Sequence, residues 1–377
     1  MNKALKACLL IVFALCGKDA SQAQGTSPSP STEGETKKES VKIHGILRGK
    51  YEYEPDLSAG RFEVRNARLS AEGNLSKRSA YKLEVDLCDE SAIKMKDAWV
   101  RLLLPLTGGD REGLLRVTLG QQRMPFSIDA HRNPSAQYFA NRSFIAKQVG
   151  DMRDVGAAVG YDFVDKDNRK VLSVDAGIYN GSNLDNQKTA WFDSPAYSAR
   201  IQYFPVKGLA IIPSVQHQLI ANREASYTSV DFGAYYEGNG LHLEAEYLRK
   251  FYAKEAFDDC NAINAMAIWT LPTSLKGTSN SFFSGISALL RYDYMDNHSD
   301  GKKGFEELPP SQGGAGRVLV QSDAQRHRLT AGATFHVRNK LFPTDIRLNY
   351  EKYWYPNNGT PKESEQDKLV AELMIRF

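Results

Sequence analysis

The chain has 377 residues, of which 42% are hydrophobic and 25% are charged, and its formal net charge is +3. This small charge excludes a nucleic-acid binder that works through overall basicity. Four cysteines are too few for a disulfide-built scaffold. Beyond residue 20 no apolar run approaches the roughly 18–20 residues of a transmembrane helix, which excludes a helical membrane bundle but leaves a β-barrel open.

The first 23 residues have the features of a secretory signal peptide. Two lysines precede an apolar stretch over residues 7–15, and Ser21-Gln22-Ala23 offers small residues for cleavage. We therefore expect Sec export and cleavage after Ala23. Lipidation of Cys16 is an alternative that its flanking residues fit poorly.

Residues 24–40 are rich in Pro, Ser, Thr, Glu and Lys and contain no residue of the buried type. Such a segment cannot offset the entropy lost on ordering. It predicts a flexible periplasmic tail before a domain that spans residues 41–377.

From residue 41 onward, apolar and polar residues alternate along the chain. Such alternation is typical of strands with one apolar and one polar face. Near Asn66-Ala67 the phase slips, which predicts a β-bulge. The pattern predicts sixteen strands, at residues 42–54, 61–74, 79–88, 94–104, 114–123, 154–163, 170–180, 195–204, 208–218, 226–237, 240–252, 260–271, 281–296, 325–338, 344–355 and 367–377.

The lengths of these strands and of their connections favour a membrane barrel. Most strands have about 10–13 residues, enough to cross a bilayer when tilted. Counted from a periplasmic N-terminus, even-numbered connections average about five residues and odd-numbered ones about thirteen, as in outer-membrane barrels. Aromatic residues near strand ends fit interface girdles, although core packing would also place them there. The sequence therefore predicts an all-β, sixteen-stranded antiparallel transmembrane β-barrel whose lumen holds water.

Seven short segments follow one another in a characteristic order. They are Phe62–Leu69, Lys96–Val100, Gly120–Ser127, Asn141–Phe144, Arg153–Gly156, Gly177–Gly181 and Glu244–Tyr247. In these segments, and in a match that runs from about Val41 to Phe377, the chain resembles the phosphate-selective porin O/P family of Gram-negative outer membranes.

The resemblance implies a porin, commonly a homotrimer surrounded by outer-membrane lipid, for passive diffusion of small hydrophilic solutes. Small anions such as phosphate would be the preferred solutes. The third outer loop, here residues 124–153, would fold inward and form the constriction. The last strand ends in Phe377, which is similar to the signal read by the barrel-assembly machinery.

The third loop carries four cations that we predict as the anion-binding constriction: Arg132, Arg142, Lys147 and Arg153. Arginine suits this role because its fork of donors binds phosphate oxygens in a bidentate way, and several weak sites in series allow release. A luminal track is predicted on the wall at Arg48, Arg65, Arg68, Arg116, Arg291 and Arg328.

Acidic residues occupy the same lumen-facing phase of the strands as these cations. The alternative is therefore a general or sugar-passing porin in which most luminal charges pair and fix the wall. An outer-membrane barrel enzyme is more distant, because no nucleophile elbow or acid/base constellation is recognisable.

No cofactor and no metal site are predicted. Asp296, His298, Asp300, Gly301 and Glu307 approximate a calcium-loop spacing, but strands flank them and two lysines oppose a dication, so we expect a solvated loop over 297–324.

Two cysteines remain after the signal peptide, Cys88 and Cys260. Their predicted strands lie far apart around the barrel, so we do not expect a disulfide between them.

Overall fold

The computed structural model describes residues 41–89, 92–106, 113–150, 152–167, 169–181, 184, 191, 194–220, 225–253, 259–272, 282–297, 305–307, 317–319, 324–339, 341–356 and 364–377. The predicted signal peptide and tail lie outside these residues. The same holds for most of the candidate calcium loop.

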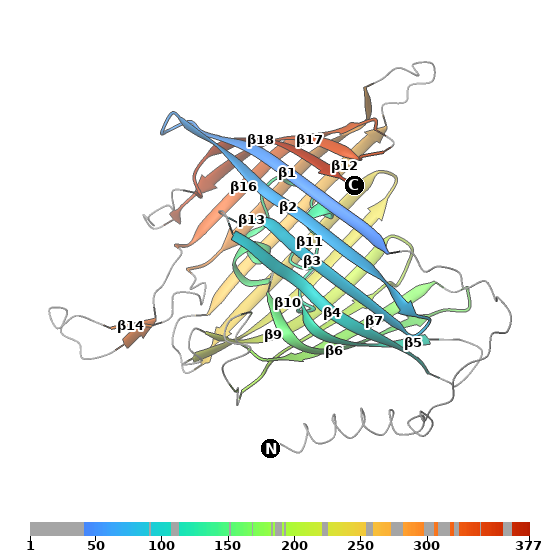
Figure 1. Ribbon diagram of the computed structural model, residues 1–377. Helices are drawn as coiled ribbons and strands as arrows, with labels where there is room; N and C mark the ends of the chain where they lie inside the picture. The colour runs from blue at the N-terminus through green and yellow to red at the C-terminus, as the bar shows by residue number, and fades with distance from the viewer. Residues whose placement is uncertain are drawn as a thin grey trace, which may run out of the picture. The chain divides into compact units, whose positions relative to one another are not determined.

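Within the described residues, sixteen strands form one closed antiparallel barrel, in which β1 pairs with both β2 and β18 (Figure 1). The strands are β1 (Lys42–Glu54), β2 (Ala59–Ser76), β3 (Ser79–Asp89), β4 (Ala92–Leu106), β5 (Gly113–Arg123), β6 (Arg153–Val164), β7 (Lys170–Tyr179), β8 (Ala196–Tyr203), β9 (Leu209–Ile220), β10 (Ala225–Gly238), β11 (Leu241–Tyr252), β12 (Cys260–Pro272), β13 (Phe283–Met295), β16 (Arg326–Val337), β17 (Thr344–Trp354) and β18 (Lys368–Arg376).

The sequence-based strand ranges are confirmed to within two residues at every end. The predicted bulge is also present: β1 and β2 shift register between Arg48 and Gly49, and Arg65 is the extra residue of β2, directly before the predicted position. One feature was not predicted. β14 (Phe305–Glu307) and β15 (Arg317–Leu319) pair as a separate two-stranded sheet within the 297–324 connection.

The alternating pattern separates the two faces of the barrel wall. On β11, His242, Glu244 and Glu246 are buried, whereas Leu243 and Tyr247 are 42% and 46% exposed. Successive side chains of a strand point to opposite faces, so the polar set lines the lumen and the apolar set covers the outside. The lumen is therefore polar and the outer surface is suited to lipid.

The barrel closes at a seam where the last residue of the chain meets β1. The amide of Gly45 donates to the carbonyl of Phe377 at 2.6 Å, and the amide of Phe377 donates back at 3.0 Å. The Phe377 ring lies over Gly45, where a Cβ would come within 2.1 Å of a ring carbon. A larger residue at position 45 would require the Phe377 ring to move.

Between β5 and β6 the described residues form two short helical turns. They are the 3₁₀-helix η1 (Pro134–Ala136) and the π-helix η2 (Ile145–Gly150). Among the described residues, no helix has the length and apolar character needed to cross a membrane.

Candidate constriction and solute path

The described residues between β5 and β6, 124–150 and 152, which we call the internal segment, lie inside the ring of strands. The segment leaves β5 and returns to β6, the neighbouring strand. Its side chains nevertheless bond to distant parts of the wall: Gln137 to Arg48 on β1, Ser127 to Glu246 on β11, and Asn141 to Glu351 on β17. The segment therefore crosses the lumen and narrows it.

An apolar patch on the lumen face of the wall holds the internal segment. Phe126, Phe144, Ile145 and Val149 pack against a wall cluster, and Phe139 packs against a second one. The wall residues are Leu248, Cys260, Ala262, Met266, Ile268, Leu289, Met295 and Tyr353. This patch was not predicted from the sequence. It is visible there as apolar residues at the inward-facing positions of β11–β13, where polar residues would be expected.

Seven wall arginines donate hydrogen bonds to backbone carbonyls of the internal segment. Three of these bonds measure 2.7 Å, from Arg48 to Ala140, from Arg328 to Arg142 and from Arg200 to Ser127. The others run from Arg123 to His131, from Arg291 to Asn141, from Arg376 to Ser135 and from Arg347 to Gln137. Backbone carbonyls must find donors when buried, so these arginines fix the course of the segment.

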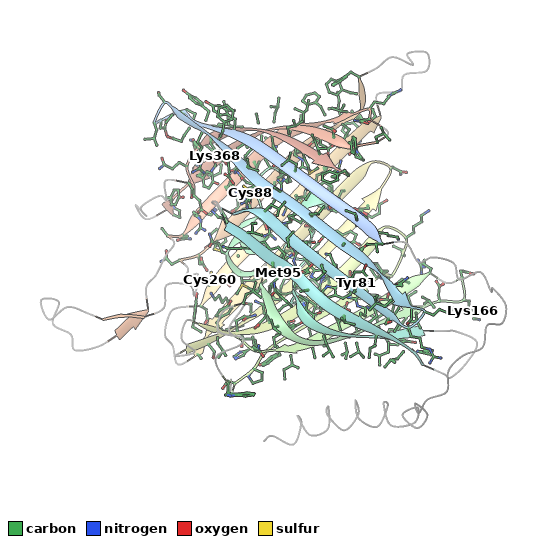
Figure 2. The ribbon with its side chains drawn as sticks, in the orientation of Figure 1. Tyr81, Cys88, Met95, Lys166, Cys260 and Lys368 are labelled. Carbon is green, nitrogen blue, oxygen red and sulfur yellow. The ribbon has the colours of Figure 1, made fainter. Side chains whose placement is uncertain are left out.

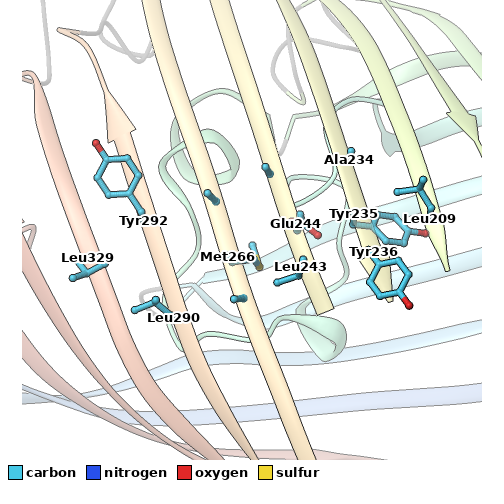
Figure 3. Close-up of a pocket in the computed structure, with 13 residues that line it drawn as sticks. Leu209, Ala234, Tyr235, Tyr236, Leu243, Glu244, Met266, Leu290, Tyr292 and Leu329 are labelled. Atoms are coloured by element: carbon cyan, nitrogen blue, oxygen red, sulfur yellow. The ribbon is translucent and has the colours of Figure 1, made fainter. Parts of the chain in front are cut away.

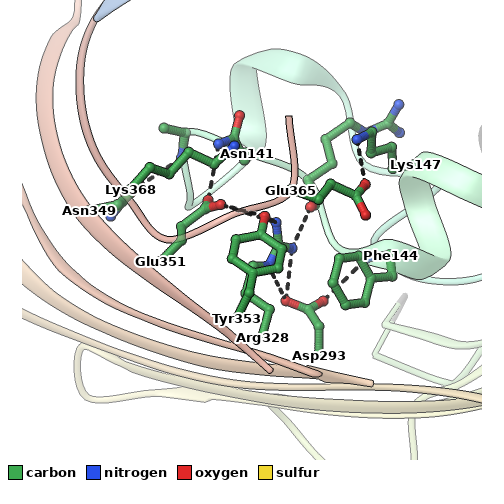
Figure 4. Close-up of polar contacts among 12 residues, drawn as sticks. Asn141, Phe144, Lys147, Asp293, Arg328, Asn349, Glu351, Tyr353, Glu365 and Lys368 are labelled. Atoms are coloured by element: carbon green, nitrogen blue, oxygen red, sulfur yellow. Dashed lines mark hydrogen bonds and ion pairs between the residues drawn. The ribbon is translucent and has the colours of Figure 1, made fainter. Parts of the chain in front are cut away.

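Wall carboxylates bind the donor groups of the same segment. Glu246 accepts hydrogen bonds from the Ser127 hydroxyl at 2.7 Å and from the amides of Ile128 and Asp129. Glu351 accepts from the Asn141 side chain at 3.0 Å, and Asp293 accepts from the Phe144 amide at 3.3 Å (Figure 4). The acidic residues of the wall thus act as anchors for the segment.

The internal segment carries its own buried ion pair. Burial alone would raise the pKa of Asp129, but the charges of Arg132 and Arg291 and the hydrogen bond from Ser143 outweigh it and lower this pKa to about 2. Burial likewise opposes the charge of Arg132, yet Glu244 and Asp129 raise its pKa above the ordinary value. Both groups are charged at neutral pH.

The structure does not bring the four predicted constriction cations together in one exposed site. Arg132 pairs with Asp129 at 2.5 Å and with Glu244, and Arg153 is buried against Asp97 at 2.9 Å. Lys147 pairs with Glu365 at 2.6 Å, although its side chain is 43% exposed. Arg142 is partly exposed and donates to the Ala130 carbonyl at 3.4 Å.

Three residues of the predicted luminal track are not on an open path. Arg48, Arg291 and Arg328 are only 1%, 2% and 2% exposed. Each is ion-paired to a wall carboxylate and bonded to the internal segment, because that segment fills their side of the lumen. Contact with water is therefore small at these three positions, and their role in a luminal track stays a prediction.

The other three predicted track residues lie on the wall opposite the anchored segment. Side-chain exposure is 34% for Arg65, 21% for Arg116 and 10% for Arg68. Their carboxylate partners are Glu63, Asp162 and Asp175, and Glu84 and Asp86, respectively. We call the wall of β2–β5 the open wall, because cations such as Arg65 and Arg116 retain access to water, whereas Glu84, Asp86 and Asp97 on it are buried.

A hollow lies against β9–β13 and β16 (Figure 3). Most of its lining is apolar and faces outward, including Tyr236, Leu243 and Leu290, which are 39%, 42% and 50% exposed. Since outward side chains face lipid, this hollow is a dent in the outer surface and not part of the solute path.

Cys88 on β3 and Cys260 on β12 are both free thiols (Figure 2). Among the described residues, no group of three or more His, Cys, Asp or Glu could hold a metal ion.

Comparison with solved structures returns porin barrels. The OmpT outer-membrane protein of Vibrio cholerae, in its trimer form, shares 11% identity over 90% of this chain and 99% of its own, with a TM-score of 0.55. An anion-selective porin from Comamonas acidovorans shares 14% sequence identity over 90% of this chain and 99% of its own, with a TM-score of 0.56. The outer-membrane channel DcaP of Acinetobacter baumannii shares 13% identity over 90% of this chain and 97% of its own, with a TM-score of 0.54. At these identities the likeness shows the fold alone.

No curated protein matches the sequence. The profile of one family, described as phosphate-selective porin O and P, matches residues 51–266, which is more than half of the chain. With this match and the closed barrel, the chain belongs to the phosphate-selective porin O and P family and is an outer-membrane channel, not an enzyme.

Proposed function

We propose that this porin prefers small anions, phosphate among them, over cations of the same size. The observation that carries the proposal is the charge of the open wall. Strands β2–β5 hold nine Lys and Arg against six Asp and Glu, an excess of three positive charges. A pore selects by the charge that lines its accessible part.

The buried side of the lumen supports this assignment by contrast. Strands β9–β13 hold three Lys and Arg against five Asp and Glu. Several of these acids, such as Glu246 and Asp293, are fully engaged by the internal segment. Their negative charge is therefore removed from the path of the solute, and the positive excess of the open wall remains.

A general porin without ion preference is the second candidate. It is favoured by the ion pairs of the open wall, where Arg65, Arg68 and Arg116 each contact a carboxylate. Paired charges of this kind fix wall geometry and attract ions only weakly.

The experiment is the reversal potential of the refolded mature protein in a planar bilayer under a KCl gradient, repeated with phosphate added. If the channel prefers anions, the reversal potential should shift toward the equilibrium potential of chloride. If phosphate binds in the pore, added phosphate should reduce the current. A potential near zero with stable conductance would leave a general porin. A folded barrel without conductance would contradict the channel assignment itself.

We further propose a homotrimer, on the support of the porin fold shared with the OmpT trimer form. The molar mass of the detergent-solubilised protein before and after heating tests this. Loss of the trimeric species only on heating is the expected result, and a monomer under native conditions would contradict it.

We also propose Sec export with cleavage after Ala23, leaving residues 24–40 as a periplasmic tail and residues 41–377 as the barrel. N-terminal sequencing of the membrane-inserted protein tests the cleavage position. Phe377 is proposed as the residue read by the barrel-assembly machinery. Its deletion should reduce insertion in cells, and unchanged insertion would contradict that role.

A further inference from the structure

The open wall contains one arginine that differs from its neighbours, Arg101 on β4. Val100 and Leu102, which flank it, are 49% and 40% exposed on the outer face, so Arg101 points into the lumen. No carboxylate oxygen in the described part of the chain lies within ion-pair distance of its guanidinium. Arg65, Arg68 and Arg116 all have such a partner.

Two contacts hold the Arg101 side chain in place. Its Nε donates to the Thr118 hydroxyl of β5 at 2.9 Å, and its guanidinium carbon lies 4.4 Å from the ring centre of Trp99. Trp99 is two residues away on the same face of β4 and lies opposite Lys82 of β3. A guanidinium fixed through Nε and one face keeps both terminal nitrogens available for a ligand.

Both terminal nitrogens lie in one plane and donate in parallel, a geometry that matches the two oxygens of a carboxylate or a phosphate. A chloride ion is a single spherical acceptor and matches the two parallel donors less well than two oxygens do. The site therefore favours an oxyanion, and Trp99 adds an apolar surface beside it for the carbon skeleton of an organic acid.

The surrounding charges set the charge of the ligand. The ionic groups that interact most strongly with Arg101 are Arg116, Asp175 and Glu72. Asp175 pairs with Arg116 at 3.1 Å, and the His44 ring lies 3.3 Å from Glu72; neither carboxylate is within ion-pair distance of Arg101. Arg101 and these three charged groups together comprise two arginines and two carboxylates, and the two nearby acids disfavour the double charge of phosphate at neutral pH more than a single negative charge.

We propose that Arg101, Trp99 and Thr118 form a binding site for small monocarboxylates with an apolar or aromatic skeleton on the solute path. This inference rests on the proposed anion path and names a solute class for it. Binding there is weak and reversible, as transport requires, because a single arginine supplies all of the charge.

The test uses benzoate, acetate and phosphate as blockers of single-channel KCl current through the refolded mature protein. Benzoate should block at lower concentration than acetate, and acetate at lower concentration than phosphate. Arg101→Lys keeps the charge but removes the fork, so benzoate block should weaken about tenfold, the factor that about 1.4 kcal/mol represents. Trp99→Leu should abolish the preference for benzoate over acetate and leave acetate block unchanged.

Arg249→Lys is the matched control, because Arg249 lies on the outward-facing side of β11, away from the solute path, and pairs with Asp259. It should leave benzoate block as in the wild type. Equal block of the wild type and of Arg101→Lys would overturn the site, as would phosphate blocking at lower concentration than benzoate. Resistance of the folded barrel to unfolding in detergent checks that each variant has inserted correctly.

The reversal potential in KCl distinguishes this inference from the anion preference. If wild-type channels show no preference for chloride but lose benzoate block in Arg101→Lys, the anion preference fails and the site stands. If chloride is preferred and Arg101→Lys behaves as the wild type, the site fails and the anion preference stands.

Discussion

The two sides of this barrel use the same polar residue types for opposite purposes. On β9–β13 the lumen-facing charges are buried under the internal segment: Glu246 is 2% exposed and Asp293 is fully buried. On β2–β5 some of the corresponding charges reach water, as for Glu63 and Arg65, whose side chains are 31% and 34% exposed, although Glu84, Asp86 and Asp97 are buried. The difference comes from the internal segment, whose apolar side chains pack on the patch formed by β11–β13 and Tyr353.

This contrast shows that a charge that lines a lumen is not always a charge that a solute meets. A buried arginine bonded to a carboxylate and to a backbone carbonyl is a structural element, since losing a partner would leave an unpaired charge in a dry environment. An arginine with one exposed edge can still exchange partners with a passing ion. The two walls can therefore be tested separately.

The largest effect is expected from Arg328→Met on the anchoring wall. The change leaves Asp293 and Glu351 without their shared partner, and loss of one member of a buried ion pair costs about 3–5 kcal/mol. The internal segment should lose its anchor, giving larger and fluctuating single-channel conductance. Arg65→Met on the open wall is the control, because Arg65 and its partner Glu63 are 34% and 31% exposed, and it should add no fluctuation to the current. Identical behaviour of the two variants would contradict the distinction between the walls.

Leu248→Ala should loosen the segment through packing alone. Leu248 is fully buried among Phe126, Phe144 and their neighbours, and such truncations cost about 2–5 kcal/mol. Channel noise should rise and protease cleavage within residues 124–152 should become faster. Leu243→Ala, on the outer face of the same strand, is the matched control. Faster cleavage in the control as well would point to general destabilisation of the barrel.

Arg65→Glu should change ion preference with little effect on stability. It replaces a 34% exposed cation of the open wall by an acid, so the reversal potential should move toward the cation side. Arg249→Glu is a control of equal charge change, since Arg249 lies beyond the lumen-facing phase and pairs with Asp259. Equal shifts in both variants would show that overall charge, not the open wall, sets selectivity.

The smallest effect is expected from pH between neutral and mildly acidic values. The pKa values of Asp129 and Glu365 are lowered to about 2, in both cases because nearby cations outweigh burial. A lowered pKa gives a stabilisation that is complete above the ordinary carboxyl value of about 4 and is lost as pH falls toward 2. Conductance and noise should therefore stay constant from pH 7 to about pH 5 and change only below about pH 4. Loosening already at pH 6 would contradict the assigned anchors.

The strand positions could be predicted from the sequence because alternation is a local property. Each strand has one face toward lipid and one toward water. The side on which residues such as Leu243 and Glu244 lie can therefore be assigned from the strand alone, without knowing which strands pair with it. The slip of phase in β2 was visible for the same reason, and the structure places the extra residue at Arg65.

The candidate site was predictable only in part. The loop that narrows the lumen stood out by its length, and its cations by their residue type. The docking patch on β11–β13 left a readable signal that was overlooked, namely Met266 and Ile268 at positions where a water-facing wall would have polar residues. Arg101 carried no such signal, because nothing local separates it from Arg116.

The sequence by itself determined that this chain closes a sixteen-stranded barrel and belongs among the porins. The alternation of residues, the strand lengths and the family segments are all local features that can be recognised without knowing the tertiary structure. Only the tertiary structure decided which luminal cations are neutralised. Arg48 and its partner Glu372 lie 324 residues apart and meet because β1 pairs with β18. Burial by the internal segment then removes them from water. Ion pairing across strands depends on register and on the path of that segment, and neither is a local property of the sequence.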